Sequence, residues 1–313
     1  MLADGKLVAF PTETVYGLGA DASNGSAVVR IFEAKGRPAD HPLIVHVADI
    51  DAAARWASDI PPQARALAAA FWPGPLTLIV SRASHVHDIV TGGQASVGLR
   101  APSHPVARAL LTEFGNGIAA PSANRFGHVS PTTARHVADD LGDAVDLILD
   151  GGACEIGIES TIVAFTTGTP TLLRRGAIDV EALATVLGRP PAMPDAAAPR
   201  APGTLAVHYA PRTPAQLVDY DVLRAELAQF DGRDERIAVL ARSAEPPDAF
   251  DGVWVSAPQD PAGYAHALYA NLRALDDAHA DTMLIESVPG DEAWSAIRDR
   301  LTRATTGVDD DRD

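Results

Sequence analysis

The chain has 313 residues, of which 47% are hydrophobic and 21% charged, and its formal net charge is −16. This length allows two domains of common size, each with its own core. The excess of acidic residues argues against a non-specific coat on nucleic acid and against adhesion to anionic membranes, so any anionic ligand needs a local cationic pocket.

The first part of the chain, residues 1–188, alternates short apolar runs with amphipathic stretches, which predicts a sheet with helices on its faces. Strands are expected at 7–10, 43–47, 76–80, 97–100, 117–120, 147–150, 160–165 and 171–174. Helices are expected near 24–35, 50–57, 62–71, 105–115, 131–141 and 179–187. Because strands and helices do not alternate regularly, we expect a mixed sheet rather than an all-parallel one.

Residues 189–214 contain seven prolines, which exclude a helix or an inner strand and predict a semi-rigid linker. A second unit is expected at 215–306. Its apolar runs predict strands at 237–240, 253–255 and 282–286, with helices over 264–275 and 294–301. This order predicts a small Rossmann-like α/β domain, without the glycine fingerprint of a dinucleotide site. The acidic tail, 307–313, is expected to be disordered.

The composition also bears on the compartment of the protein. The single cysteine, Cys154, cannot form an internal disulfide and indicates a reducing environment. The N-terminus shows no secretory signal, and no run of 18 or more apolar residues predicts a membrane span. Cys/His spacing of the metal-binding kind is absent. We therefore expect a cytoplasmic protein without membrane contact.

Lys35 interrupts an apolar helix face. Val28, Ile31 and Phe32 recur at helical spacing, and position 35 continues the same stripe one turn further. A lysine there must reach water, an ion pair or a bound anion, because an unpaired buried ammonium is unfavourable. Arg37 adds a second cation just beyond the helix end, and the chain has only two lysines against 23 arginines. Together they predict a small clamp for an anion.

Further polar residues follow the predicted strands. Residues 11–17 (Pro-Thr-Glu-Thr-Val-Tyr-Gly) come after the first strand, and 121–124 (Pro-Ser-Ala-Asn) after the strand at 117–120. Arg100 and Arg174 close two other strands. Because ligands usually bind beyond the carboxyl ends of strands in open α/β sheets, these segments are expected to share one mouth. Such a concentration of positive charge would suit a nucleoside triphosphate.

Each candidate residue also has an ordinary structural explanation. Ser130, followed by Pro131, has the pattern of a helix N-cap, and a helix N-terminus favours phosphate, but capping alone explains the pattern. Lys35 can extend its amine to the surface at a helix end. The other ordinary explanations are turn hydroxyls for Thr12 and Thr14, surface ion pairs for Arg100 and Arg174, and a satisfied core histidine for His46.

At these residues the chain resembles the family of threonylcarbamoyl-AMP synthases of the YrdC/Sua5 type. The motifs that carry the resemblance are Phe10–Asp21 (FPTETVYGLGAD), Lys35–Pro38 (KGRP), Pro42–His46 (PLIVH), Phe71–Thr77 (FWPGPLT), Gly98–Arg100 (GLR), Pro121–Asn124 (PSAN), Glu159–Thr161 (EST), Leu173–Gly176 (LRRG) and His208–Pro211 (HYAP). The resemblance implies a YrdC-like twisted mixed sheet with helices on its faces, a linker or lid, and a Sua5-type C-terminal domain.

The resemblance also implies a reaction. Family members convert ATP, L-threonine and bicarbonate or CO2 into L-threonylcarbamoyl-AMP and pyrophosphate, which is nucleotidyl transfer. A tRNA threonylcarbamoyl transferase complex then uses the product to modify adenosine 37 of tRNA to t6A. The implied partners are therefore ATP, threonine, bicarbonate, that downstream complex and a contact with tRNA. Mg²⁺ is expected to arrive with ATP, and no protein ligand can be assigned to it.

Site residues are carried over from the family position by position. The implied ATP contacts are Lys35, Arg37, His41, Ser96, Ser122, Asn124, Ser130, Arg174 and Tyr209. The implied threonine contacts are Thr14, His46, Arg100, Ala120 and Ser160. Position 41 departs from the family pattern, which has asparagine before Pro-Leu where this chain has His41. Lys35 and Arg37 are the expected catalytic residues.

The chemistry agrees with these residue types. The guanidinium of Arg100 can bind the carboxylate of threonine through two parallel hydrogen bonds, which lysine cannot imitate. The reaction requires no protein nucleophile, so positioning and charge neutralisation can provide most of the acceleration. Tyr209, placed at the nucleotide, would make residues 200–211 a lid that shields the adenylate from water.

Two other functions remain open. The first is a module of the same fold that binds double-stranded RNA or tRNA, since a cationic hollow could hold a phosphate backbone. RNA binding would give no role to Thr14, His46 and Ser160, and the negative net charge weakens electrostatic attraction to RNA. The second is a carbamoyl-transferring enzyme of the hydrogenase-maturation type, and the absence of zinc-finger and acylphosphatase-like segments argues against it.

Overall fold

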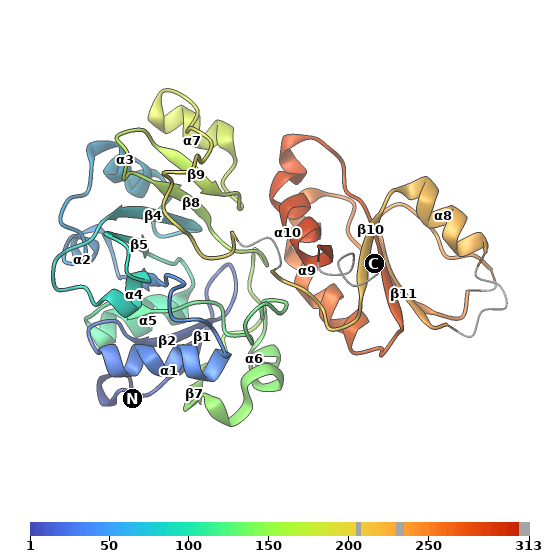
Figure 1. Ribbon diagram of the computed structural model, residues 1–313, viewed down its shortest axis with the longest axis horizontal. Helices are drawn as coiled ribbons and strands as arrows, with labels where there is room; N and C mark the ends of the chain where they lie inside the picture. Colours follow the sequence, from blue (N-terminus) through green and yellow to red (C-terminus); the bar gives the residue numbers. More distant parts are fainter. Residues whose placement is uncertain (205–207, 230–234, 249, 307–313) are drawn as a thin grey trace. The chain divides into compact units, whose positions relative to one another are not determined.

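A computed structural model describes residues 1–204, 208–229, 235–248 and 250–306 of the chain. The chain divides into two compact units (Figure 1). The first contains residues 1–126 and 130–204, and the second contains residues 127–129 and the described residues from 208 onward. The predicted tail at 307–313 lies outside the described residues.

The first unit is built on a nine-stranded mixed sheet. Its strands are β1 (Val8–Phe10), β2 (Gly17–Asp21), β3 (Ile44–His46), β4 (Leu76–Ser81), β5 (Ser96–Arg100), β6 (Ile118–Ala119), β7 (Leu147–Ile148), β8 (Thr161–Ala164) and β9 (Thr171–Arg174). Its helices are η1 (Leu2–Asp4), α1 (Gly25–Lys35), α2 (Ile50–Ala54), α3 (Pro62–Phe71), α4 (Asp88–Thr91), α5 (Pro105–Phe114), α6 (Ala134–Leu141), η2 (Gly142–Ala144) and α7 (Val180–Leu187). The spatial order is β7-β1-β2-β6-β3-β5-β4-β8-β9. The prediction of a mixed sheet is confirmed.

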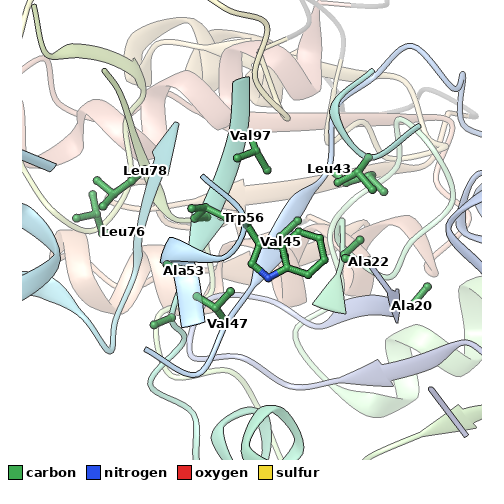
Figure 2. Packing of buried hydrophobic residues seen from close by; sticks show 14 of the residues in the cluster. Ala20, Ala22, Leu43, Val45, Val47, Ala53, Trp56, Leu76, Leu78 and Val97 are labelled. Carbon is green, nitrogen blue, oxygen red and sulfur yellow. The ribbon is translucent and has the colours of Figure 1, made fainter. Parts of the chain in front are cut away.

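One face of this sheet carries the main apolar core. Helices α1, α3, α4 and α7 contribute buried side chains to it, and every second residue of β3, β4 and β5 points into it. The indole of Trp56 lies in this core with Val45, Val47 and Ala53 (Figure 2). Such burial of apolar area is the main stabilising contribution to a fold. The opposite face is covered by α5 only over β1 and β6, through Ala107 and Leu111 among others.

The second unit contains a four-stranded parallel sheet with the order β10-β13-β11-β12. Its elements are β10 (Ala215–Val218), α8 (Tyr220–Ala228), β11 (Ile237–Ala241), β12 (Val253–Ser256), α9 (Pro261–Asp276), β13 (Thr282–Glu286), η3 (Glu292–Trp294) and α10 (Ser295–Thr305). Helix α8 packs on one face of this sheet, and α9 and α10 lie on the other (Figure 1). This arrangement agrees with the predicted small Rossmann-like domain.

Several elements are present that the sequence pattern did not predict, among them β2, the short helix α4, β10 and α8. Strand β2 contains two glycines, which weaken the strand pattern, yet a Cβ at Gly19 would lie only 2.8 Å from Phe10 and Ile118. Glycine is therefore needed where the ring of Phe10 lies against the backbone of β2. Strand β10 and helix α8 precede the first strand that we expected in the second unit.

The proline-rich segment that begins at residue 189 lies partly on the first unit. Up to residue 204 it forms no helix and no named strand. Ala192 exchanges backbone hydrogen bonds with Pro170 and Leu172, and Ala201 packs against Ile79 and Ile162 of the sheet. Among the described helices, none combines the length and hydropathy that a membrane span requires.

Candidate functional site

Polar side chains of β5 lie on the sheet face opposite the main core. Val97 and Leu99 point into that core, so the strand alternation places Ser96, Gly98 and Arg100 on the other face. Arg100 is nevertheless only 4% exposed. The strand therefore presents a buried cation to one face of the sheet.

Neighbouring strands extend this polar face on both sides. His46 is the register partner of Arg100 on β3. On β4, Thr77 pairs with Ile162 of β8, and Arg174 of β9 pairs with the same Ile162. Register partners point to the same face of a sheet. The predicted residues therefore share a face. They also share the predicted carboxyl edge, because β3, β5 and β9 run in the same direction and end at His46, Arg100 and Arg174.

Arg100 is held by the loop that follows β1, residues 11–16, which we call the 11–16 loop. Its Nη2 donates to Glu13 Oε1 at 2.7 Å, and its Nη1 donates to the Thr14 hydroxyl at 2.8 Å. The second oxygen of Glu13 accepts from the Ser103 backbone at 3.0 Å. Burial is the largest influence on the pKa of Glu13 and raises it, but the charge and hydrogen bonds of Arg100 outweigh burial and lower the pKa.

The hydroxyl of Thr14 has a fixed direction. Thr12 donates its only hydroxyl proton to the Val15 carbonyl at 2.6 Å, so Thr14 must be the donor in its 2.9 Å contact with Thr12. Thr14 also accepts from Arg100. One acceptor position of the Thr14 oxygen is left for a ligand, and only a donor can use it.

His46 is a neutral, buried imidazole beside Arg100. Burial, followed by the positive charge of Arg100, lowers the pKa of His46 to about 3. Its ring packs edge-on against Phe10 at a centroid distance of 5.7 Å. Within the described residues, its Nδ1 atom is buried without a hydrogen-bond partner. The ring therefore adds an uncharged polar group to the site.

A second group of residues surrounds Lys35, the last residue of α1, which ends where Gly36 adopts a left-handed conformation with φ 64°. The Lys35 Nζ donates to the carbonyls of Ser122, at 2.6 Å, and Asn124. Burial and the neighbouring charge of Arg37 hold the pKa of Lys35 well below its usual value. An anion at this ammonium would favour its charged form.

Arg37 and His41 both contact one aromatic ring, that of Phe126. The Arg37 guanidinium carbon lies 5.8 Å from the centroid of Phe126, and its Nη2 donates to the Pro42 carbonyl at 3.0 Å. The His41 ring contacts the same phenyl edge-on at 5.3 Å. Burial and the charge of Arg37 lower the pKa of His41. His41 therefore stands in the same cluster as Arg37.

The third group is centred on Ser160. Arg174 donates to the Ser160 carbonyl at 3.0 Å and to its hydroxyl at 3.1 Å, and the hydroxyl of Thr77 lies 2.7 Å from the same oxygen. The third nitrogen of Arg174 donates to the Pro202 carbonyl at 2.9 Å. Part of the proline-rich segment is thus fastened over the polar face of the sheet.

The structure corrects the prediction that Ser130 caps a helix. Ser130 is not a helix N-cap, because α6 begins three residues after Pro131, at Ala134, and Thr133 accepts the capping hydrogen bond from the helix backbone. The Ser130 hydroxyl donates instead to Glu159 at 2.6 Å. Both Ser130 and Glu159 are buried, so this pair belongs to the interior of the site.

The remaining predicted residues of the first unit lie on the same elements. Ser96 begins β5 and is buried. The backbone N–H of Ala120, directly after β6, donates to Ile44 at 2.9 Å. The Asn124 side chain donates to the Arg125 carbonyl at 2.8 Å.

Two connections join the three groups. The 11–16 loop binds Arg100 through Glu13, and it also accepts from the Ala123 backbone through the Tyr16 carbonyl at 2.9 Å, next to the residues that hold Lys35. The second connection is between β4 and β5, which are joined by the register pair Leu78–Leu99. Thr77, which contacts Ser160, is the next residue of β4 in the direction of Arg100. The structure therefore links the surroundings of Lys35, Arg100 and Arg174 within one unit.

Tyr209 belongs to the second unit. Its ring stacks on Tyr269 at 5.7 Å, and the guanidinium carbon of Arg300 lies 5.3 Å from its centroid. Its φ of 64° is in the left-handed region, which is unusual for a tyrosine. The predicted contact of Tyr209 with ATP stays a prediction. Residues 205–207 of the predicted lid lie outside the described residues.

Four site residues lay inside the quoted motifs, but the sequence analysis gave them no binding role: Thr12, Glu13, Thr77 and Glu159. Glu13 and Glu159 are acids in a site selected for its cations. Their signal was an acid in a motif next to a strand, after β1 for Glu13 and before β8 for Glu159. In the described residues, no group of three or more His, Cys, Asp or Glu side chains could hold a metal ion.

Comparison with protein families gives two matches. The Sua5_yciO_yrdC family, described as "Telomere recombination", matches residues 1–176. The family described as "Threonylcarbamoyl-AMP synthase, C-terminal domain" matches residues 178–306. The boundary between the two matches falls just after β9, before helix α7.

Comparison with individual proteins gives relatives along nearly the whole chain. A threonylcarbamoyl-AMP synthase of Pyrococcus abyssi is 39% identical, covering 97% of this chain and 92% of its own. One of Bacillus subtilis is 40% identical, covering 98% and 91%. The crystal structure of P. abyssi Sua5 complexed with L-threonine superposes with a TM-score of 0.90 at 38% identity, covering 98% of this chain and 92% of that one.

Proposed function

Because this chain belongs to the Sua5/YrdC family of threonylcarbamoyl-AMP synthases, we propose that it makes L-threonylcarbamoyl-AMP and pyrophosphate from ATP, L-threonine and bicarbonate or CO2. The observation that carries this proposal is the buried guanidinium of Arg100, held by Glu13 and Thr14 beside a neutral His46. Such a group is a rigid carboxylate receptor with hydrogen-bond partners of defined direction around it.

L-Threonine would bind on the polar face of the first sheet. Arg100 pairs with its carboxylate, and the remaining acceptor position of Thr14 takes an N–H or O–H donor of the amino acid. His46 and Ser160 border the same region, and the backbone at Ala120 closes it. In support, the similar P. abyssi protein was crystallised with L-threonine.

ATP would bind among the remaining cations. Lys35 and Arg37 neutralise phosphate oxygens from one side and Arg174 from the other, while Ser122, Asn124 and Ser130 supply polar groups. Ser96, His41 and Tyr209 complete the proposed contacts. Binding of a phosphate next to Lys35 would restore the ammonium charge that burial disfavours. Mg²⁺ would come with the nucleotide, and no described residue is assigned to it.

The chemistry has two steps. The free amine of threonine first attacks CO2, which forms an N–C bond, and the nitrogen loses one proton to solvent to leave a carbamate. A carbamate oxygen then attacks the α-phosphorus, forming the new P–O bond, and the bond to pyrophosphate breaks. The protein holds the two reactants in line and neutralises the charge on the phosphates, which is sufficient for phosphoryl-type transfers. Lys35 and Arg37 have this catalytic role.

The product is a mixed anhydride that water destroys, so shielding matters. The contact of Arg174 with Pro202 fastens the proline-rich segment over the polar face. We propose that this segment acts as a lid and that a tRNA threonylcarbamoyl transferase complex receives the product for t6A synthesis. Deleting residues 201–210 should increase the ATP consumed per molecule of product. An unchanged ratio would contradict the lid.

The decisive experiment measures pyrophosphate release from the protein with ATP, bicarbonate and each amino acid in turn. Release should require threonine and should fall strongly in Lys35→Ala and Arg174→Ala variants whose melting temperatures are retained. Release that is independent of the amino acid, or equal in the variants, would contradict the proposal.

RNA binding is less well supported. Lys35, Arg100 and Arg174 are only 4%, 4% and 6% exposed, so these cations cannot meet the backbone of a duplex. A filter-binding titration with double-stranded RNA should therefore show no steep salt dependence that these three residues control.

A further inference from the structure

The carboxyl edge of the second sheet gathers polar residues outside the proposed active site. All four strands run parallel, so their carboxyl ends meet at this edge. Arg242 follows β11, Glu286 ends β13, Tyr264 lies in the first turn of α9, and Trp294 ends η3. Ligands of open parallel sheets usually bind beyond such an edge.

Glu286 already occupies the loop that follows β11. Its Oε2 accepts the backbone N–H groups of Arg242, Ser243 and Ala244 at 2.7, 2.8 and 3.1 Å. Its Oε1 accepts from the Ser243 hydroxyl. Burial is the largest influence on the pKa of Glu286 and raises it, but these hydrogen bonds outweigh it and lower the pKa. Glu286 is thus a satisfied carboxylate that folds the loop around itself.

The guanidinium of Arg242 has no such partner. In the part of the chain that the structure describes, no carboxylate or carbonyl accepts from it, and its Nε is buried. Its guanidinium carbon lies 5.6 Å from the centroid of Trp294, so the aromatic ring holds it in place. Arg242 as a whole is half-buried, so its Nε–H is the donor that is closed off from water and has no acceptor in the described chain.

Tyr264 adds a second donor without an acceptor. It is 1% exposed, and within the described residues its hydroxyl is buried with no hydrogen-bond partner. Its ring meets Trp294 edge-on at 5.5 Å, so Trp294 contacts both Tyr264 and Arg242. The charges of Glu286 and Arg242 both act on this hydroxyl, which places the three groups in one cluster.

We propose that this edge binds an oxyanion, the phosphate or carboxylate group of a small molecule, through the Nε–H of Arg242 and the hydroxyl of Tyr264. The Nε–H can only donate and the hydroxyl can donate as well, so one acceptor can satisfy both groups. Because the cation among them has no ion pair, a negatively charged acceptor is favoured over a neutral carbonyl. Glu286 cannot be that partner, since its oxygens accept from the loop.

The test uses the full chain with an Arg174→Gln change, which weakens phosphate binding at the first unit. Inorganic phosphate and acetate are titrated separately by calorimetry. Arg242→Gln should weaken binding of the preferred anion at least ~10-fold, and Tyr264→Phe about 5-fold. Arg224→Gln is the matched control, because Arg224 also lies over an aromatic ring, Tyr220, at 5.9 Å, but is exposed.

Four results bear on the proposal. Tyr264→Phe should keep or raise the melting temperature without anion, since its hydroxyl has no hydrogen bond to lose. Preference for phosphate over acetate identifies a phosphate-bearing ligand, and the reverse identifies a carboxylate. Equal affinity in Arg242→Gln and in the control, or no binding of either anion, would overturn the proposal. In the protein that keeps its native Arg174, neither Arg242→Gln nor Tyr264→Phe should change pyrophosphate release.

Discussion

The two sheets of this protein collect polar residues in different ways. In the second unit all strands are parallel, so Arg242 and Glu286 meet at a common carboxyl edge. In the first unit β4 runs antiparallel to β5, so strand ends alternate between edges. Here Arg100 and His46 are brought together by register on one face. They also lie at one carboxyl edge, because β3 and β5 are parallel to each other and end at these two residues. A mixed sheet can therefore gather a site from those of its strands that share a direction.

The partners of the two arginines differ as well. Arg100 is held by a carboxylate and a hydroxyl of its own chain. Arg242 rests on an aromatic ring, with no acceptor among the described residues. The first arrangement fixes a cation in place before any ligand arrives. The second leaves hydrogen-bonding capacity that only a ligand or water can use.

The largest effect is expected from Arg100→Lys. Lysine keeps the charge but loses the planar fork, so pyrophosphate release should fall about 100-fold with little change in melting temperature. Arg108→Lys, at an exposed position of α5, is the control and should behave like the parent protein. A variant that retains more than about a tenth of the activity would show that the fork is not required.

Glu13→Gln tests the support of Arg100. The change leaves a buried cation without its counter-charge, so the first unit should lose about 3 kcal/mol of unfolding free energy at pH 7. The folded-state pKa of Glu13 is lowered, so its contribution is present above the unfolded pKa and is lost as pH falls through the folded value. Urea titrations at pH 7 and about pH 3 should therefore show a smaller difference between parent and variant in acid.

His46 provides a pH test of the polar face. Its folded pKa of about 3 lies below the unfolded value, so the stability from keeping it neutral is complete above about pH 6.5 and declines below it. The slope attributable to His46 should approach 1.4 kcal/mol per pH unit between about pH 6 and 4. His46→Gln should remove that part of the slope in denaturant titrations. An identical slope in the variant would mean that His46 titrates normally.

The smallest effect is expected at the second sheet. Ser243→Ala removes one of the four donors to Glu286 and leaves the three backbone donors in place. The second unit should lose about 1 kcal/mol, measured by urea unfolding. Thr305→Ala, which removes a hydroxyl bonded only to helix carbonyls, should change stability less. Equal losses would show that the loop around Glu286 is not specially held.

Much of the fold followed from local patterns. Helix α1 and its stop at Gly36 followed from apolar spacing and a glycine. Lys35 was expected to reach water, an ion pair or an anion, but its amine is buried and donates to two backbone carbonyls. Strand β2 was not predicted because its glycines weaken the strand pattern. They are needed for packing against Phe10, which is a tertiary requirement. Ser130 was misassigned as a cap because Thr133, three residues later, fits the same capping rule and is the residue that caps.

The site was less accessible to sequence reasoning than the fold. Lys35 was recognisable because it stands where an apolar residue was expected, and Arg100 and Arg174 because they close predicted strands. Their partners were not, because Glu13 lies 87 residues from Arg100 and Thr77 lies 83 from Ser160. Pairing over such separations depends on strand order, and strand order could not be deduced from the spacing of apolar residues. The resemblance to the family named the binding positions but not the groups that hold them.

Gly98, between Ser96 and Arg100, has a consequence of its own. Its backbone is unstrained, and an added methyl would lie at ordinary contact distances of 3.5 Å from Ile44 and 3.6 Å from Thr77. Folding alone therefore does not require glycine at this position. In the proposed threonine site, side chains of increasing size at position 98 would make the binding region shallower one carbon atom at a time, while the scaffold stays intact.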